Sequence, residues 1–542
     1  MSAPGVDHGP GHGHGGGAPH DGPGIHGAFG SIAEHDEAPR RSWTARLLTL
    51  LAIIGPGLIV MVGDNDAGGV ATYAQAGQNY GLTLLWTLPL LIPVLVVNQE
   101  MVVRLGAVTG VGHARLIFER FGRFWGAFSV GDLFILNFLT IVTEFIGVSL
   151  ALGYFGISAY ISVPLAALGL VAITASGSFQ RWERFMFVFV AVNFLVIPLA
   201  VFAHPHAGPV IHGFLVPGVK HGFNSTSILL IIAIVGTTVA PWQLFFQQSN
   251  IIDKGITTRW INYERTDTVL GSFVVVIGAS LLMVTVAFAF AHTLMAGHFT
   301  NAEGVAQGLA RSLGHGAGAM FAIILLNASI IGAAAVTLST SYAFGDVFGV
   351  QHSLHRRVSE AKFFYASYTA MVVVAAGIVL IPRAPLGVIT TSVQALAGVL
   401  LPSATVFLIL LCNDEAVLGP WVNRPWVNAV ATVVVSALLV LSLILMTTTV
   451  FPTINVQALL IVLAAALVLT LSVAGVGYRR ALRRRPPVAE VAKPRRDTWR
   501  MPPLALLERP EWSPGRKRAM LVLRVYLVAS VVLLLAKAVQ LG

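Results

Sequence analysis

From Ser42 onward, long apolar runs recur along the chain, separated by short polar segments that hold most of the arginines and lysines. A helix needs roughly 20 apolar residues to cross the hydrocarbon core of a bilayer. The pattern therefore predicts twelve membrane-spanning helices, of which the first and the sixth are broken. They are predicted at residues 43–78, 83–103, 125–152, 157–175, 184–203, 225–250, 267–295, 317–343, 362–382, 387–412, 427–450 and 455–477.

The first apolar run is interrupted in its middle by the polar and glycine-rich segment GDNDAGG, residues 63–69. Two carboxylates, Asp64 and Asp66, would then lie near the bilayer centre, where each costs several kcal/mol unless something offsets it. A helix broken by glycines exposes backbone carbonyls, and these together with a bound cation neutralise the acids. The segment therefore predicts a cation site.

A second interruption, GTTVAPWQ at residues 236–243, falls in the sixth run. A proline within a helix removes one backbone hydrogen bond and clashes with the preceding turn. Breaks in the first and sixth spans are where two five-span inverted repeats would each place their opening helix, and the binding site then lies between them. We expect a ten-helix transporter core at 42–412, with alternating access by rocking of one bundle against the other, and two additional spans within 413–477.

Composition agrees with an integral membrane protein. Hydrophobic residues make up 56% of the chain and charged residues 11%, against roughly 25% charged in soluble domains. The net charge of +10 comes mainly from arginines that lie between alternate spans. This distribution predicts a plasma-membrane protein with its N-terminus in the cytoplasm. It therefore gives no reason to expect nucleic-acid binding. The single cysteine excludes a disulfide framework. No catalytic motif is present, so we expect neither an enzyme nor a bound cofactor apart from the transported ion.

The two ends of the chain differ from this core. Residues 1–41 are rich in glycine, proline and histidine and are predicted to form a disordered cytoplasmic tail. Its histidines offer weak transition-metal binding, but the sequence favours a solvated tail without that role. Residues 478–518 form a basic cytoplasmic linker. The final apolar stretch, 519–542, carries two internal charges and is predicted either to lie along the interface or to span the membrane.

Several ordered motifs resemble the Nramp divalent-metal transporters. The similarity covers roughly residues 45–412 and implies a fold of the leucine-transporter type, with two inverted repeats of five helices and broken spans 1 and 6. The matching segments are DAGGVAT at 66–72 for the family's DPGN-containing stretch, RLGAVTG at 104–110 for RLGxVTG, EFIG at 144–147 for EVIG, APWQ at 240–243 for Met-Pro-His-Asn, and Gln394, eight residues before Pro402.

Departures from the family pattern concentrate at the predicted site. Ala67 and Gly69 stand where the family has proline and asparagine, Ala240 replaces methionine and Trp242 replaces histidine, and Ile141 stands where an acid is expected. This pattern resembles the Nramp-related magnesium transporter branch. Loss of a soft sulfur ligand weakens selection for transition ions. Magnesium prefers oxygen ligands and keeps several of its waters.

The resemblance and the two breaks together indicate the candidate site residues. Several have an alternative role: Asp64 pairing with an arginine or facing the vestibule, and Gln243 and Gln394 forming hydrogen bonds between helices. For Glu144 the sequence leaves open a hydrogen bond between helices and a proton relay. The predicted metal ligands are Asp66, Asp64, Asn65, Gln243, Thr237 and Gln394, and the predicted pathway or gating residues are Ala240, Trp242, Gly69 and Glu144.

Two functions remain open at this stage. The first is uptake of partly hydrated Mg²⁺, and also of Mn²⁺, without proton coupling, because Trp242 cannot titrate near neutral pH as histidine does. The alternative is a proton-coupled Mn²⁺/Fe²⁺ importer of the Nramp type. Transport of an organic substrate is disfavoured, because two acids at the first break leave no partner for a substrate carboxylate. The expected partners are divalent metal ions and the lipid bilayer.

Overall fold

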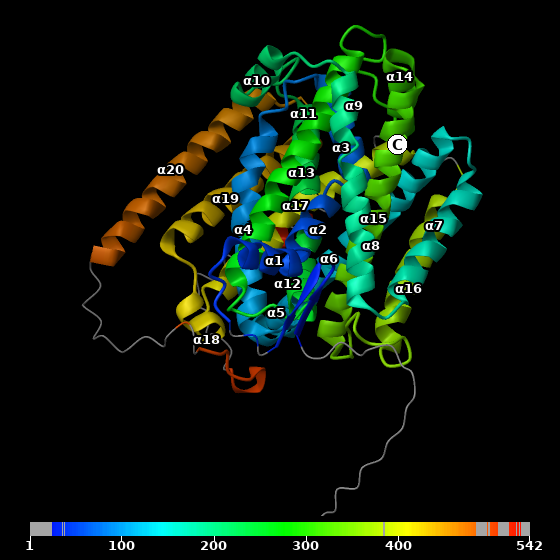
Figure 1. Cartoon of the computed structure of the whole chain (residues 1–542). Coiled ribbons are helices and arrows are strands. Elements are labelled where there is room, and N and C mark those ends of the chain that lie inside the picture. The colour runs from blue at the N-terminus through cyan, green and yellow to red at the C-terminus, as the bar shows by residue number, and fades with distance from the viewer. Residues whose placement is uncertain are drawn as a thin grey trace, which may run out of the picture.

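The computed structural model describes residues 24–483 except 35, 37, 383, 384 and 452, and beyond these it describes 496, 499–507, 517, 520–526, 528, 529 and 532. Most described residues belong to long helices that run side by side in one bundle (Figure 1). The elements of the first half are β1 Gly24–Gly27, β2 Gly30–Ala33, α1 Trp43–Ile53, α2 Pro56–Gly63, α3 Ala67–Tyr80, α4 Thr87–Thr109, α5 His113–Phe121, α6 Arg123–Tyr154, α7 Ala159–Thr174, α8 Phe179–Asn193, α9 Val196–Phe202 and α10 Ala207–Leu215. Those of the second half are α11 Ser225–Thr238, α12 Pro241–Asp253, α13 Ile261–Phe290, α14 Ala302–Leu313, α15 His315–Phe348, α16 Lys362–Val379, α17 Leu386–Cys412, α18 Glu415–Leu418, η1 Gly419–Trp421, α19 Pro425–Val450, α20 Val456–Arg483 and η2 Leu504–Leu506.

Every predicted span coincides with a helix or a group of consecutive helices. Among the described residues, ten helices or helix pairs have the length and apolarity to cross a membrane, or eleven if the bent pair α1 and α2 counts as one span. Helix α7 has 16 residues and falls short of that length. The predicted fold class, an all-helical integral membrane protein, is confirmed.

The two broken spans pack against each other in opposite directions. The first half of one contacts the second half of the other: α2 packs on α12, and α3 packs on α11. Helix α17 covers both α3 and α11, while α6 and α15 form another large helix contact of the bundle. Because α2 and α3 run antiparallel to α11 and α12, both breaks come to the same level of the bundle.

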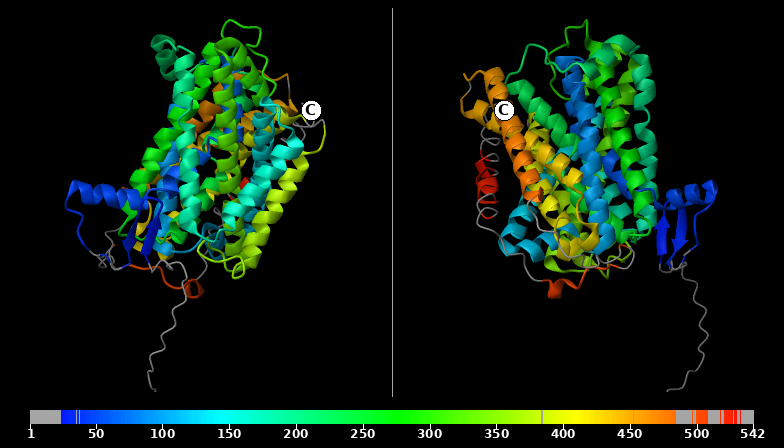
Figure 2. Two further views of the ribbon diagram at one scale, coloured as in Figure 1. Left: turned by 45° about the vertical axis from the view of Figure 1, so that its right-hand side comes forward. Right: turned by 90° about the vertical axis from the view of Figure 1, so that its left-hand side faces the viewer.

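The first span contains an additional bend that the sequence pattern did not predict. Helices α1 and α2 meet at Ile54 and Gly55 with an angle of 53°. Gly55 has a φ of 151°, a backbone conformation that residues with a side chain rarely adopt. As a result α1 leaves the bundle and projects from its side (Figure 2).

The tail predicted to be disordered contains an ordered hairpin, β1 paired with β2. Ile25 and Ile32 are opposite each other in this pairing, and both are buried against the bundle. The edge of the Phe29 ring packs on Phe187 of α8. Two β-branched residues in register and one aromatic anchor thus order this short segment. Of the tail histidines only His26 lies among the described residues, and much of the predicted helix 519–542 lies outside them.

A buried lysine holds the C-terminal end of α1. Lys254, at the end of α12, donates from Nζ to the carbonyl oxygens of Ile53 and Ile54 at 2.8 and 3.0 Å. It also forms an ion pair of 2.6 Å with Glu183 of α8, and both side chains are almost completely buried. The second carboxylate oxygen of Glu183 accepts the N–H of Ala28 in the hairpin at 2.6 Å. One ion pair therefore joins α1, α8, α12 and the hairpin.

A buried aspartate holds the other side of the same bend. Asp267 of α13 accepts the backbone N–H groups of Gly55, Gly57 and Leu58 at 3.0, 2.8 and 3.2 Å. These are the unpaired donors that begin a helix, and the helix dipole favours a negative charge there. The carbonyl end of α1 thus faces a cation and the amide end of α2 faces an anion.

Candidate metal-transport site

The break in the first span places Asp66 at the start of α3. Its backbone is extended, and its Oδ1 accepts the N–H of Gly69 at 2.6 Å, so it caps the helix. Short polar side chains are preferred at this position because they satisfy an otherwise unpaired helix donor. The carboxylate consequently lies at the positive end of the α3 dipole.

Asp64 lies at the C-terminal end of α2, two residues before Asp66. It is 0% exposed, and neither of its carboxylate oxygens has a hydrogen-bond partner among the described residues. No ion pair in the described part of the chain includes Asp64 or Asp66. A buried carboxylate without a partner costs several kcal/mol. A bound cation would remove that cost.

The break in the sixth span faces these acids. Helix α11 ends at Thr238, Ala240 is extended, and α12 begins at Pro241. The hydroxyl of Thr237 lies 3.5 Å from Asp66 Oδ1. The structure therefore brings Asp66 and Thr237 together, although they are far apart in sequence.

Glycines allow this close approach. A Cβ atom at Gly69 would lie 2.8 Å from the carbonyl oxygen of Asp64 and 2.9 Å from the Thr237 hydroxyl. A Cβ atom at Gly68 would lie 1.6 Å from the side-chain nitrogen of Gln394. The amide nitrogen of Gln394 has no hydrogen-bond partner among the described residues. Gln394 thus packs directly on the start of α3, beside Asp66.

Glu144 reaches the same place from α6. Its Oε2 accepts the N–H of Ala67 at 3.1 Å, while Oε1 has no partner among the described residues. A Cβ atom at Gly332 of α15 would lie 2.4 Å from Glu144 Oε2 and 2.9 Å from Asp66 Cβ. The side chains of Asp66 and Glu144 therefore lie close together in the buried interior.

Two of the predicted ligands are engaged elsewhere. Gln243 accepts the amide of Gln99 at 2.9 Å and donates to the carbonyl of Thr238 at 3.3 Å, so its amide bridges α4 and the end of α11. Asn65 donates to the carbonyl of Val275 on α13 at 3.2 Å and lines an apolar cavity of about 270 Å³ beside α8 and α13. In this conformation their amides serve helix contacts.

Trp242 fills the space next to the first break. It is 1% exposed, and a Cβ atom at Gly63 would lie 3.2 Å from its ring. Ser339 of α15 donates to its carbonyl oxygen at 3.0 Å. Ala240 is also buried, at 4% exposed. Because Asp64 and Asp66 are 0% and 2% exposed, the site is closed to solvent in this conformation.

Sequence reasoning missed Tyr73 and Gln99. The hydroxyl of Tyr73 lies 2.7 Å from that of Thr238 and joins α3 to α11. Tyr73 follows Asp66 by two helical turns and so shares its helix face, a signal that could have identified it. Gln99 is a polar residue inside the second span, but nothing in the sequence shows that it meets Gln243.

The site offers hard oxygen ligands, and few of them come from the protein. Among the described residues, no group of three or more His, Cys, Asp or Glu side chains is arranged to hold a metal ion. Any cation at the break would therefore be bound by the carboxylates together with hydroxyl, amide or backbone oxygens and water. Mg²⁺, Ca²⁺ and Mn²⁺ are ions suited to such ligands.

Comparison with known proteins identifies the family. The model of the family described as "Natural resistance-associated macrophage protein-like", or Nramp, matches residues 57–448. The chain belongs to the Nramp family. The matched region runs from α2 to the end of α19 and so contains both broken spans.

Curated relatives of this Nramp protein are named as transporters. It is 26% identical over 408 residues to the Divalent metal cation transporter MntH of Aeromonas hydrophila, covering 71% of this chain and 93% of that protein. It is 27% identical over 405 residues to the protein of the same name from Bacillus subtilis, covering 71% and 89%. The family and the helices together make this chain a multi-pass membrane transporter.

Solved structures share the fold. A crystal structure of the Eremococcus coleocola manganese transporter matches with a TM-score of 0.61 at 19% sequence identity, covering 82% of this chain and 97% of that one. At this level of identity the match establishes the arrangement of helices and nothing about the ion.

Proposed function

We propose that this Nramp protein carries divalent metal cations across the membrane by alternating access, with Mn²⁺ among its substrates. The observation that carries the proposal is the pair of buried carboxylates, Asp64 and Asp66, at a helix break that faces a second break. The names of the curated relatives, which refer to divalent metal cations, support the same ion class.

The relatives' names fit the second of the two alternatives left by the sequence, a proton-coupled Mn²⁺/Fe²⁺ importer, better than the first. The first alternative, Mg²⁺ transport, stays a second candidate because of two side chains. Ala240 supplies no sulfur, and Trp242 supplies neither a metal-binding nor a titratable nitrogen, so the ligands on offer are oxygens. Such a site selects weakly against Mg²⁺.

Proton coupling is favoured by one feature and disfavoured by another. Glu144 and Asp66 lie against the same glycine, and buried carboxyl groups this close exchange a cation for a proton readily. Trp242 and Ile141 occupy the positions where the family pattern has a histidine and an acid, which removes two further proton acceptors. We expect metal ions to cross the membrane with little or no accompanying movement of protons.

One measurement tests ion choice and coupling together. Proteoliposomes containing the full chain and a pH-sensitive dye would be given Mg²⁺, Mn²⁺ or Ca²⁺ in separate runs. We expect Mn²⁺ and Mg²⁺ uptake with little acidification of the lumen. Uptake of Mn²⁺ alone, with protons entering in proportion, would instead identify a coupled manganese importer.

We further propose that the chain lies in the plasma membrane with its N-terminus in the cytoplasm, as the arginine distribution predicts. A potential that is negative inside would then drive entry of a divalent ion by about 4.6 kcal/mol per 100 mV.

Ala240→Met should shift ion preference toward manganese. Ala240 is buried at the break, and a thioether there would favour Mn²⁺ over Mg²⁺ as a softer ligand. We expect the ratio of Mn²⁺ to Mg²⁺ uptake to rise by roughly tenfold, equivalent to about 1.4 kcal/mol. Ala240→Leu is the matched control, because it adds similar volume without sulfur. An equal shift in both variants would mean that volume, not sulfur, sets the preference.

A further inference from the structure

A pocket of about 230 Å³ lies at the end of the bundle that also carries the N-terminal hairpin and α18 (Figure 1). Its charged lining consists of four arginines and one carboxylate, that of Glu100, and two tryptophans complete its rim. The lining arginines are Arg104, Arg265, Arg424 and Arg496, and the tryptophans are Trp421 and Trp426. We call this the arginine pocket. Its excess of positive charge favours binding of an anion.

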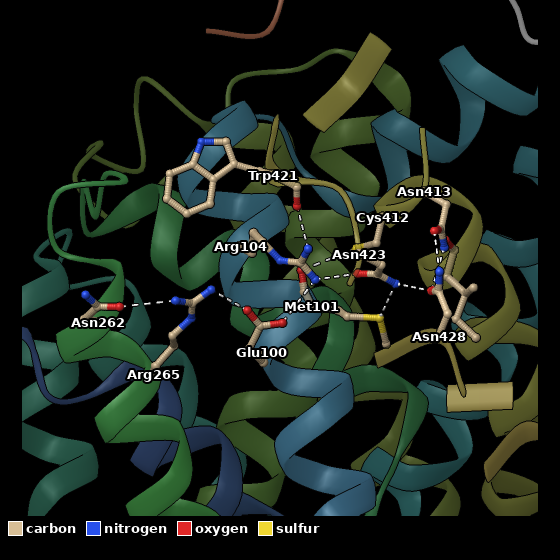
Figure 3. A network of polar contacts seen from close by, with 11 residues as sticks. Glu100, Met101, Arg104, Asn262, Arg265, Cys412, Asn413, Trp421, Asn423 and Asn428 are labelled. Atoms are coloured by element: carbon tan, nitrogen blue, oxygen red, sulfur yellow. Dashed lines mark hydrogen bonds and ion pairs between the residues drawn. The ribbon is translucent and has the colours of Figure 1, made fainter. Parts of the chain in front are cut away.

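Arg104 of α4 is the buried member of the arginine pocket. Its side chain is 6% exposed, and its terminal nitrogens donate to the Trp421 carbonyl at 2.5 Å, to Asn423 at 2.5 Å and to Glu100 at 3.1 Å (Figure 3). Its Nε is buried and has no hydrogen-bond partner among the described residues. The guanidinium is thus held rigidly by three hydrogen bonds.

Arg265 approaches the same carboxylate from α13. It donates to Glu100 Oε1 at 2.5 Å and to Asn262 at 3.2 Å, as Figure 3 shows, and its Nε is likewise buried without a partner among the described residues. Glu100 therefore forms ion pairs with both Arg104 and Arg265 but neutralises only one of their two positive charges. Guanidinium groups fixed in this way suit the oxygens of a phosphate.

The two remaining arginines lie at the solvent side of the arginine pocket. Arg424 is exposed and precedes α19. Arg496 donates to the carbonyl of Pro420 at 3.2 Å, and its guanidinium lies 5.0 Å from the ring centroid of Trp421. Trp426 is 58% exposed. Tryptophan and arginine side by side at the end of membrane helices are typical of the level of the lipid headgroups.

An apolar groove of about 640 Å³ lies between α4, α11 and α19, on the same helix faces as the arginine pocket. On α4, Pro93 of the groove precedes Glu100 of the pocket by seven residues, or two helical turns, so the two residues share a helix face. On α19, Val430 and Val433 of the groove follow Trp426 by four and seven residues. From residue 100 to residue 90 of α4 the rise is about 15 Å, roughly half of a 30 Å hydrocarbon core.

We propose that the arginine pocket and the apolar groove together bind one anionic phospholipid of the leaflet on the hairpin side, the predicted cytoplasmic leaflet. The phosphate lies among Arg104, Arg265 and the outer arginines, and an acyl chain follows the groove along α4 and α19. Basic pockets between membrane helices recognise lipid headgroups in this way. A soluble phosphate compound shares the headgroup chemistry but leaves the groove unfilled. The lipid would join the core helices α4 and α13 to the peripheral helix α19.

The test uses the purified full chain in nanodiscs of phosphatidylcholine alone or with phosphatidylglycerol, followed by mass spectrometry of the retained lipid and thermal unfolding. The double variant Arg424→Gln/Arg496→Gln changes only exposed side chains, and the matched control is Arg356→Gln/Arg357→Gln, two exposed arginines elsewhere. At roughly fivefold per arginine near a membrane surface, we expect the first pair to weaken phosphatidylglycerol retention on the order of 25-fold. The control pair should leave it unchanged.

Two further arms separate lipid from a soluble anion. Ala437→Phe narrows the groove and should reduce retention of phosphatidylglycerol, whereas Val374→Phe on the exposed face of α16 should not. Inorganic phosphate at millimolar concentration should leave the unfolding midpoint in phosphatidylcholine unchanged, while phosphatidylglycerol raises it. Equal retention by the arginine variant and its control, or a phosphate effect matching that of the lipid, would overturn the proposal.

Discussion

Asp66→Asn is expected to abolish metal uptake in proteoliposomes while leaving the protein folded and inserted. The substitution removes the charge at the first break but keeps the size of the side chain and its capping of α3, since asparagine caps a helix as well as aspartate does. Loss of one charged ligand worth about 3 kcal/mol predicts a fall in uptake on the order of 100-fold. Uptake is followed with Mn²⁺ and with Mg²⁺, because the prediction holds for either ion.

The controls for this prediction separate ligand loss from misfolding. Asp66→Ala also removes the cap of α3. This variant should therefore lose transport and, in addition, about 0.5–2 kcal/mol of stability, which is the typical cost of losing a helix cap. Asp36→Asn removes an acid that pairs with Arg40 outside the bundle and should transport normally. If Asp66→Asn kept more than about a tenth of wild-type uptake, the Asp66 carboxylate would not be a main ligand of the metal. The metal site would then have to lie elsewhere in the chain.

The sequence predicted those features that depend on local pattern. Apolar runs of the right length mark the helices, and glycine, proline and buried acids mark both breaks, because each disrupts a helix through its own backbone or charge. The pairing of the first break with the sixth follows from their positions in two repeats. That is why the proximity of Asp66 to Thr237, at 3.5 Å, agrees with the predicted site.

Features set by distant partners were not predictable. Whether Gln243 faces the ion or α4 depends on Gln99, which is 144 residues away in the chain. Asn65 is adjacent to two predicted ligands but its amide donates to α13, because successive residues at a helix end point in different directions. Lys254 follows the predicted sixth span, where a basic residue is typical of the charges that orient a membrane protein, yet it is buried in an ion pair with Glu183.

Lys254→Met should destabilise the protein strongly. The lysine is completely buried, pairs with Glu183, and caps two carbonyls of α1. Removing one member of a buried ion pair leaves the other charge uncompensated, which typically costs about 3–5 kcal/mol. We expect a much lower midpoint in thermal unfolding of the detergent-solubilised protein. Lys362→Met, at an exposed lysine that begins α16, is the matched control.

A second substitution identifies the origin of that loss. Glu183→Gln in the Lys254→Met background removes the stranded charge, so it should restore part of the stability, because a pair replaced on both sides is often close to neutral. Recovery stays incomplete, since the carbonyls of Ile53 and Ile54 still lack a donor. An equal midpoint for Lys254→Met and Lys362→Met would mean that the bend between α1 and α2 does not depend on this ion pair. The bend would then be fixed from the other side, by the three N–H groups that Asp267 accepts.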